Sequence, residues 1–247
     1  MEDLAGKRVI VTGGGSGIGE ALVRLASNAG AESIVLDYDR DAGESVAAAN
    51  NAEFRQLDVS DPDQWEAVVE SLGVIDYAAL NAGIMTALPN EPLSAGNALT
   101  VKADRYKRVM AVNVDGVLFG LRSLLPVMNQ QGGCITVTAS MAGLVPIAYD
   151  PIYAMSKHAV VGLIRSLEQD PERQNANVRI NSICPGGVAT ALVPEQFAAM
   201  KATMMDPEII ASEIINLWQQ GAHGEIRVRL QTDLPAEVVS PPELTGM

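Results

Sequence analysis

A tyrosine and a lysine stand four residues apart at Tyr153 and Lys157, and a serine, Ser140, precedes the tyrosine by thirteen residues. On a helix, residues i and i+4 lie one turn apart on the same face. Ser140 closes an apolar run that reads as a buried strand. A phenol, an ammonium and a hydroxyl brought together can move a proton to or from a carbonyl oxygen. The Y-x-x-x-K spacing occurs by chance on many helices, so its meaning depends on the elements around it.

Short apolar runs alternate with helix-length segments along the whole chain. We expect strands at 8–12, 33–36, 54–58, 75–80, 134–139, 178–183 and 225–230, and helices at 18–28, 40–50, 62–71, 103–130, 152–169 and 207–220. This alternation predicts an α/β fold, a doubly wound parallel sheet of about seven strands with helices on both faces. We expect a single Rossmann domain over residues 1–247, with a substrate lid at about 186–207 and an irregular tail at 231–247.

The first predicted strand runs into a glycine-rich turn, T-G-G-G-S-G-I-G at residues 12–19, and then into a helix. Such glycines let backbone N–H groups approach a pyrophosphate at the positive end of the helix. The candidate phosphate-side residues are Gly13, Gly15, Ser16, Gly17, Ile18 and Gly19. Asp37 ends the second strand, where a carboxylate accepts ribose hydroxyls and repels a 2′-phosphate, so we expect NAD as the cofactor. The alternatives are a glycine-rich loop without function and a surface aspartate in a turn.

Composition restricts the class of partner. The formal net charge of −13 argues against nucleic acid and anionic membranes, which attract basic patches. Cys134 and Cys184 sit in apolar runs and are read as reduced core residues. His158 and His223 have no ligand partners at metal spacing, so we expect no metal. The acidic N-terminus does not resemble a signal peptide, which favours a cytoplasmic protein.

With these motifs placed, the chain resembles the short-chain dehydrogenase/reductase family of single-domain oxidoreductases over about residues 5–230. The resemblance is carried by the turn at 12–19, Asp58-Val59, Asn81-Ala82-Gly83, Asn113, Ser140, Tyr153 with Lys157, and Pro185-Gly186 with Thr190. The second half is most similar to NAD-dependent secondary-alcohol dehydrogenases of the family, including those that act on hydroxy fatty acids such as prostaglandins. Asp150 departs from that subgroup, which has a substrate-contacting glutamine there.

The resemblance implies roles for individual residues. Tyr153 is expected to be the general base or acid, Lys157 to lower its pKa, Ser140 to hold the substrate oxygen, and Asn113 to complete a proton relay. Cofactor contacts are further expected from Tyr38, Asp58, Val59, Asn81, Ala82, Gly83, Tyr153, Lys157, Pro185, Gly186, Val188 and Thr190.

The expected substrate wall is apolar, and a neutral secondary alcohol or ketone is the predicted substrate. The wall comprises Ser140, Met141, Val145, Ile147, Asp150, Tyr153, Leu192, Val193 and Phe197. Asp150 is expected to repel an anionic group near the reacting carbon. The alternatives are a prostaglandin-like 15-hydroxy dehydrogenase of hydroxy fatty acids and, outside enzymes, a non-catalytic NAD-binding sensor. Helices 103–130 and 152–169 carry apolar residues on more than one side, which predicts a homodimer or homotetramer.

Overall fold

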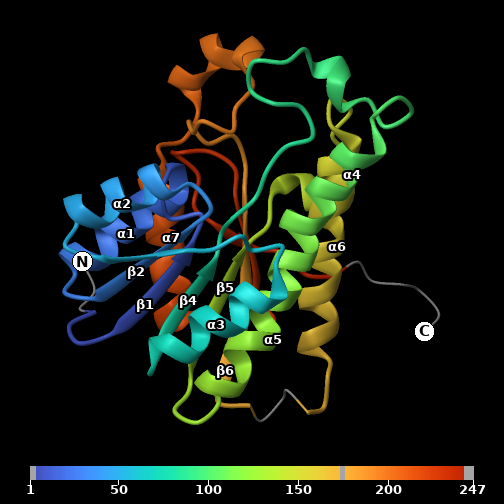
Figure 1. The fold of residues 1–247 in the computed structure, drawn as a ribbon. Helices are drawn as coiled ribbons and strands as arrows, with labels where there is room; N and C mark the ends of the chain where they lie inside the picture. Colours follow the sequence, from blue (N-terminus) through green and yellow to red (C-terminus); the bar gives the residue numbers. More distant parts are fainter. Residues whose placement is uncertain (1–3, 173–175, 242–247) are drawn as a thin grey trace.

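The computed structural model describes residues 4–172 and 176–241, and it is organised around one twisted sheet (Figure 1). The strands, in chain order, are β1 (Arg8–Thr12), β2 (Glu32–Asp37), β3 (Glu53–Gln56), β4 (Tyr77–Leu80), β5 (Gly133–Thr138), β6 (Val178–Pro185), β7 (Ile226–Arg229) and β8 (Glu237–Val238). Their order across the sheet is β3-β2-β1-β4-β5-β6-β7-β8. The pairings from β3 to β7 are parallel, and β8 runs antiparallel to β7.

Helices cover both faces of the sheet. They are α1 (Gly17–Asn28), α2 (Arg40–Ala49), α3 (Pro62–Leu72), α4 (Ala103–Met110), α5 (Gly116–Met128), α6 (Pro151–Glu168) and α7 (Pro207–Gln220). Along β1, Val9 and Val11 join a core with α1, α2 and α7, whereas Ile10 joins a core with α3, α5 and α6. Because successive side chains of a strand point to opposite faces, one short strand contributes to both cores.

Aspartates set the start of four helices. Asp39, Asp61, Asp150 and Asp206 each accept a backbone N–H from the first turn of α2, α3, α6 and α7. Proline follows three of these caps, at Pro62, Pro151 and Pro207, where its missing N–H and fixed φ suit a first helical position. The short Asp-Pro signal therefore fixes where the Tyr153 helix begins.

The predicted helix at 103–130 is interrupted. A π-helical turn at Ala111–Asp115 separates α4 from α5, which re-aims the residues it contains. Residues 103–128 are long and apolar enough to cross a membrane by length and composition. Their inner side chains Val117, Leu121 and Leu124 are instead buried in the sheet core, as in a core helix of a globular protein.

Two connections at the carboxyl ends of the strands contain short helices. The loop at 84–102, called here the β4 loop, contains a 3₁₀ helix at Leu93–Gly96, and the lid at 186–207 contains another at Glu195–Thr203. The tail prediction is wrong at residues 237–238, which form β8 by pairing with β7. A strand of two residues is too short to show an alternating pattern in the sequence. Residues 242–247 lie outside the described part.

Strand order reverses between β1 and β4. In open α/β sheets, ligands bind outside the carboxyl ends of the strands at such a switch point. The glycine turn, the β4 loop, the segment after β5 and the lid all leave the sheet at these ends (Figure 1).

Candidate active site

The glycine turn after β1 leaves room for a phosphate-sized group and for close backbone approach. Gly13 and Gly17 adopt φ of 63° and 57°, which side-chain-bearing residues rarely adopt. A Cβ on Gly13 would lie 2.9 Å from Ala82 Cα, and one on Gly17 would lie 3.0 Å from Thr190 Cγ2. The turn thus forms a cradle that only glycine leaves open, at the N-terminus of α1, and its residues fit the pyrophosphate of a dinucleotide.

Asp37 lies at the end of β2 and is oriented by the same turn. Its Oδ2 accepts a hydrogen bond from Gly15 N–H at 2.8 Å, and its Oδ1 accepts one from Asp39 N–H at 2.9 Å. Each carboxylate oxygen retains a second lone pair, so both remain able to accept a ribose hydroxyl. A 2′-phosphate here would meet a fixed negative charge.

Ser140 and Tyr153 meet in front of the carboxyl end of β5. The Ser140 hydroxyl accepts from Ala142 N–H at 3.1 Å, and Ser140 and Tyr153 line the same cavity. Burial raises the pKa of Tyr153 to about 12, and the Ser140 hydroxyl acts against that rise. This direction differs from the lowered pKa expected from Lys157, because desolvation of the phenolate outweighs the neighbouring groups.

Lys157 is buried beneath the tyrosine, with 3% of its surface exposed. Its Nζ donates to Thr138 O at 2.9 Å and lies 5.7 Å from the centroid of the Tyr153 ring. Burial lowers the pKa of Lys157 to about 8. A Cβ on Gly83 would lie 3.3 Å from this Nζ, so the bare backbone after β4 makes room for the ammonium.

Asn113 lies in the π-helical turn and holds the start of the β4 loop. Its Oδ1 accepts from Ile84 N–H at 2.8 Å, and its Nδ2 donates to Ile84 O at 2.9 Å and to Ser156 Oγ at 3.0 Å. The side chain is fully buried, and its Oδ1 would lie 3.4 Å from a Cβ on Gly83. Asn113 and Lys157 therefore flank the same glycine from two sides.

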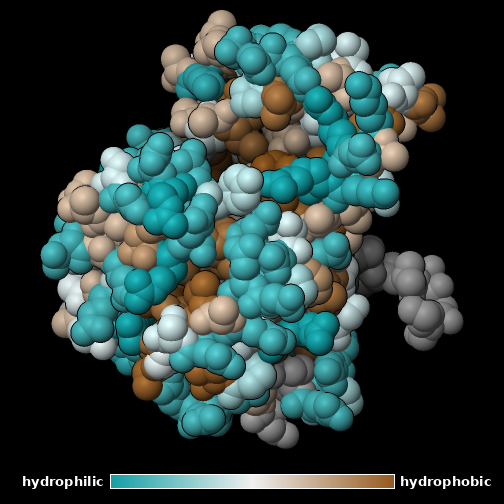
Figure 2. Space-filling view, viewed as in Figure 1, coloured by the Kyte–Doolittle hydropathy of each residue, from teal (hydrophilic) through white to brown (hydrophobic). Residues whose placement is uncertain are grey.

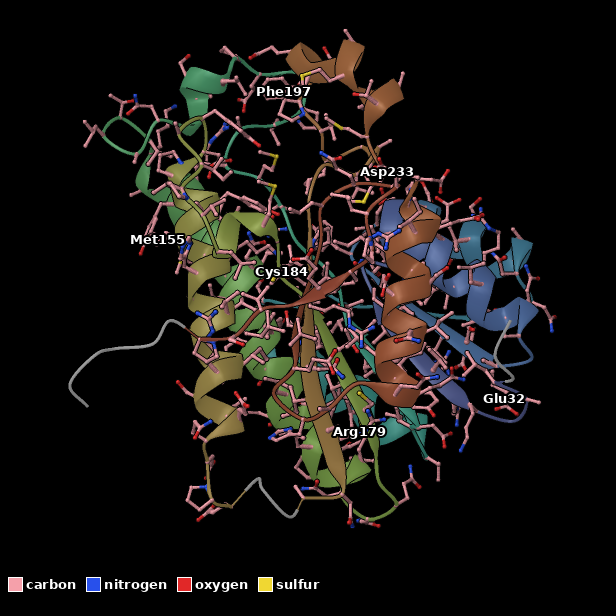
Figure 3. The ribbon with its side chains drawn as sticks, turned by 180° about the vertical axis from the view of Figure 1, so that it is seen from behind. Glu32, Met155, Arg179, Cys184, Phe197 and Asp233 are labelled. Atoms are coloured by element: carbon pink, nitrogen blue, oxygen red, sulfur yellow. The ribbon has the colours of Figure 1, made fainter. Side chains whose placement is uncertain are left out.

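A cavity of about 650 Å³ joins the glycine turn to these side chains. Figure 2 shows apolar side chains in the hollow beneath the lid, and Figure 3 labels Phe197 on the lid and Cys184 on β6 beneath it. Of the predicted site residues, the cavity is lined by Gly13, Ser16, Gly17, Ile18, Asn81, Ala82, Gly83, Ser140, Met141, Ile147, Tyr153, Lys157, Pro185, Gly186, Val188, Thr190, Leu192, Val193 and Phe197.

Several predicted nucleotide contacts lie outside this lining, at the rim or beneath it. Tyr38 is 62% exposed, with the Arg108 guanidinium 5.3 Å from its ring centroid. Asp58 accepts from Ser60 and lies 3.6 Å from Arg108, while Val59 is buried. These residues lie at the carboxyl ends of β2 and β3, on the side of the turn where the adenosine is expected.

Two glycines of the turn, Gly15 and Gly19, also lie outside the cavity lining. A Cβ on Gly15 would lie 2.9 Å from the Asp37 carboxylate.

Two predicted substrate contacts are not in the cavity. Val145 is 42% exposed and lies outside the cavity lining. Asp150 is 1% exposed, and its oxygens accept from the N–H groups of Tyr153 and Thr86. It is a helix cap that faces the protein interior, so the predicted contact between its side chain and the substrate is wrong.

The prediction missed the first half of the β4 loop. Ile84, Met85, Ala87, Leu88 and Pro89 all line the cavity. The available signal was their position, since they directly follow Asn81-Ala82-Gly83 at the carboxyl end of a predicted central strand.

A doubly wound sheet with a phosphate-binding turn, a ribose-directed carboxylate and a Ser/Tyr/Lys set defines a dinucleotide-dependent oxidoreductase of the Rossmann type. Residues 7–201 match the short chain dehydrogenase family, and the chain belongs to that family.

Related proteins of known name share this architecture. A 2,5-dichloro-2,5-cyclohexadiene-1,4-diol dehydrogenase of Sphingobium indicum is 36% identical over 78% of this chain and 77% of its own. Human 15-hydroxyprostaglandin dehydrogenase [NAD(+)] is 30% identical over 88% of each chain. Meso-2,3-butanediol dehydrogenase of Serratia marcescens is 36% identical over 74% of this chain and 72% of its own.

A solved structure also superposes closely. The 3-ketoacyl-(acyl-carrier-protein) reductase of Brucella melitensis, complexed with NADH, gives a TM-score of 0.80 at 26% identity, over 92% of this chain and 97% of that chain.

The buried ammonium yields a stability prediction. Lys157→Met should raise the free energy of unfolding of the cofactor-free protein at pH 7 by about 1–3 kcal/mol, because it removes a charge held in the interior. The native pKa of about 8 lies below the ordinary 10.5. The native state therefore binds fewer protons than the unfolded state between these values, and Lys157 makes wild-type stability rise with pH there.

Urea unfolding at pH 7.0 and pH 9.5 measures the difference. The difference in the free energy of unfolding between Lys157→Met and the wild type should be smaller at pH 9.5 than at pH 7.0. A gap that is independent of pH, or a destabilised variant, would show that Lys157 carries no burial penalty.

The position of Asp37 yields a cofactor prediction. Asp37→Ala should lower the ratio of kcat/KM with NAD to kcat/KM with NADP by at least about tenfold, since it removes both the ribose acceptor and the repulsion of a 2′-phosphate. Asp39→Ala is a control at the same turn, because it removes a helix cap and keeps the Asp37 carboxylate. A wild-type protein that prefers NADP would contradict the assignment.

Proposed function

We propose that this protein interconverts neutral, apolar secondary alcohols and their ketones. NAD is its cofactor and, when bound, supplies the hydride acceptor and the positive charge of its nicotinamide. The observation that carries the substrate class is the cavity lining. Among the described residues that line it, Lys157 is the one charged side chain, and apart from Ser140 the substrate end is lined by apolar and aromatic residues.

Tyr153 takes the proton of the substrate hydroxyl in oxidation and returns it in reduction. Tyr153 and Ser140 line the same cavity, so an alcohol oxygen bound there can meet both hydroxyl groups. The Ser140 hydroxyl donates to that oxygen as negative charge develops on it. Because burial holds the Tyr153 pKa high, nearby positive charge is needed to favour the phenolate.

Lys157 provides one such charge. With a pKa of about 8, it remains largely protonated at neutral pH. Asn113 keeps the backbone of Ile84 and Gly83 in place beside it, so that the ammonium has both space and a fixed orientation. Asn113 thereby supports proton transfer indirectly, by holding the backbone beside Lys157.

The apolar wall comes from two sides of the cavity. Tyr149 and Phe197 meet edge to face at 5.3 Å between ring centroids, which joins the start of α6 to the lid. Lys201, the one basic residue of the lid, lies outside the lining. A substrate carboxylate would find no basic partner among the lining residues placed here apart from Lys157, which is already beside Tyr153.

The relatives support a neutral substrate in part. Two of those named above are dehydrogenases of diols, and the third is named for a prostaglandin. A prostaglandin-like hydroxy-acid dehydrogenase is therefore the second candidate. A non-catalytic NAD-binding sensor is disfavoured, because a sensor has no use for the Ser140 and Tyr153 pair.

A matched pair of substrates tests the proposal. An uncharged secondary alcohol should give a higher kcat/KM with NAD than its ω-carboxylate analogue of equal chain length, by at least about tenfold, because the carboxylate is desolvated without a partner. Nicotinamide absorbance measures turnover. Lys201→Ala should leave the ratio unchanged.

Tyr153→Phe is the control for the chemistry and should keep NADH binding while kcat falls below about a tenth of the wild-type value, a barrier increase above about 1.4 kcal/mol. A faster carboxylate substrate whose advantage disappears in Lys201→Ala would favour the second candidate.

We also propose a cytoplasmic homodimer or homotetramer that packs through α5 and α6. Leu118 on α5 and Met155 on α6 are 40% and 42% exposed, and Met155 projects from the outer side of α6 in Figure 3. A helix that carries apolar side chains on more than one side has to bury the outer ones, which supports packing against another subunit.

Sedimentation equilibrium at micromolar concentration should show a dimer or tetramer. Met155→Glu should shift the equilibrium toward smaller species. A wild-type monomer would contradict this proposal.

A further inference from the structure

Asp150 is a buried carboxylate whose two oxygens hold two different segments. Oδ1 accepts from Tyr153 N–H at 3.0 Å, which caps α6 at the residue that carries the phenol. Oδ2 accepts from Thr86 N–H at 2.9 Å, inside the β4 loop and 64 residues away in sequence. One side chain thus joins the backbone of the proposed base to the loop that forms one wall of the cavity.

The same stretch of the β4 loop is held from its outer side by an ion pair. Arg105 on α4 donates to Thr86 O at 3.0 Å and from Nη2 to Glu91 Oε1 at 2.8 Å, and it also bonds Glu91 Oε2. Glu91 in turn accepts from Leu88 N–H at 2.8 Å. The hydrogen bond from Arg105 lowers the pKa of Glu91 to about 2, so this pair stays charged at any pH near neutrality. Thr86 is therefore fixed through both its N–H and its carbonyl.

The β4 loop is bonded to the lid at its far end. Glu195 N–H donates to Pro89 O at 2.8 Å. Gln196 donates from Nε2 to Glu91 O at 2.9 Å and accepts from Leu93 N–H at 3.3 Å. The two segments that close the cavity are thereby connected to each other as well as to the body.

We propose that Asp150 is a positioning residue that ties Tyr153 to the closed arrangement of the β4 loop and lid. Its carboxylate lies outside the cavity lining and contacts Tyr153 through the backbone N–H. Its carboxylate makes the register of α6 and the position of Thr86 interdependent, so that the phenol is aligned when the wall around the substrate is in place. The proposal rests on the proposed function in taking Tyr153 as the base.

Two substitutions at Asp150 separate its contacts. Asn has one acceptor oxygen, so it can cap α6 but presents an N–H₂ group to one of the two N–H donors. Ala loses both contacts. We expect Asp150→Asn to raise KM for the alcohol about fivefold or more, with smaller change in kcat, and Asp150→Ala to lower kcat about tenfold as well. The Kd for NADH, followed by its fluorescence, should stay within about twofold of wild type.

Amide hydrogen exchange provides a readout that does not depend on turnover. In Asp150→Ala, peptides from both the β4 loop and the lid should exchange at least about fivefold faster, while those of α7 should not change. Arg105→Gln, made at a partly exposed position, should accelerate the same two segments without altering the α6 cap. If Asp150→Ala folds poorly, the exchange measured in Arg105→Gln still tests the proposal.

Asp61→Ala is the matched control, because Asp61 caps α3 through two backbone N–H groups and makes no contact with the β4 loop. It should leave KM, kcat and exchange in the loop and lid unchanged. Asp150 is only a helix cap if two results are found together. Asp150→Asn would keep the wild-type KM and kcat, and amide exchange in the β4 loop and lid would be unchanged in both Asp150→Ala and Arg105→Gln. Altered exchange in a protein that oxidises no secondary alcohol would instead count against the proposed function alone.

Discussion

The site depends on keeping a lysine ammonium inside the protein, beneath a tyrosine whose own burial disfavours its charged form. Lys157 donates one hydrogen bond to a strand carbonyl, and Gly83, which has no side chain, leaves room beside its Nζ. This constraint explains several neighbouring features together. Gly83 supplies the space, and the π-helical turn directs Asn113 onto the adjoining backbone. The start of α6 must be fixed to bring Lys157 to the Thr138 carbonyl and to Gly83.

In this protein, different residues contribute to stability and to the proposed chemistry. A buried, singly bonded ammonium is destabilising at neutral pH. In the proposed function, its contribution is the positive charge that it places near the phenol. The two cores on the faces of the sheet bury large side chains such as Trp65 and Trp218, whose ring N–H groups are bonded to backbone carbonyls. They provide the apolar burial that offsets the cost at the strand ends.

The sequence was sufficient for the fold class and for the residues that meet at the strand ends, because both follow from local patterns. Strand and helix periods differ, glycines mark the phosphate turn, and Tyr153 and Lys157 share a helix face by spacing alone. Asp150 was assigned the wrong surroundings because its direction is decided by Thr86, a contact far away in sequence. The raised pKa of Tyr153 was missed for a related reason, since the depth of burial depends on how the β4 loop and lid pack. A two-residue strand such as β8 has no period to detect and exists only through its partner.

That short strand alters how the sheet meets its surroundings. An unpaired edge is a template on which another chain can add a strand. At one margin, β3 presents Glu53 and Arg55, which pair with each other, and Arg8 also reaches Glu53. At the other, β8 occupies part of β7, and Arg227 is held by Glu213 and Glu225. Among the strands that the structure describes, neither margin is a long, flat, apolar edge, so the sheet is guarded against growing sideways into an aggregate. Removing residues from 236 onward would uncover β7 and leave that protection to its charged side chains alone.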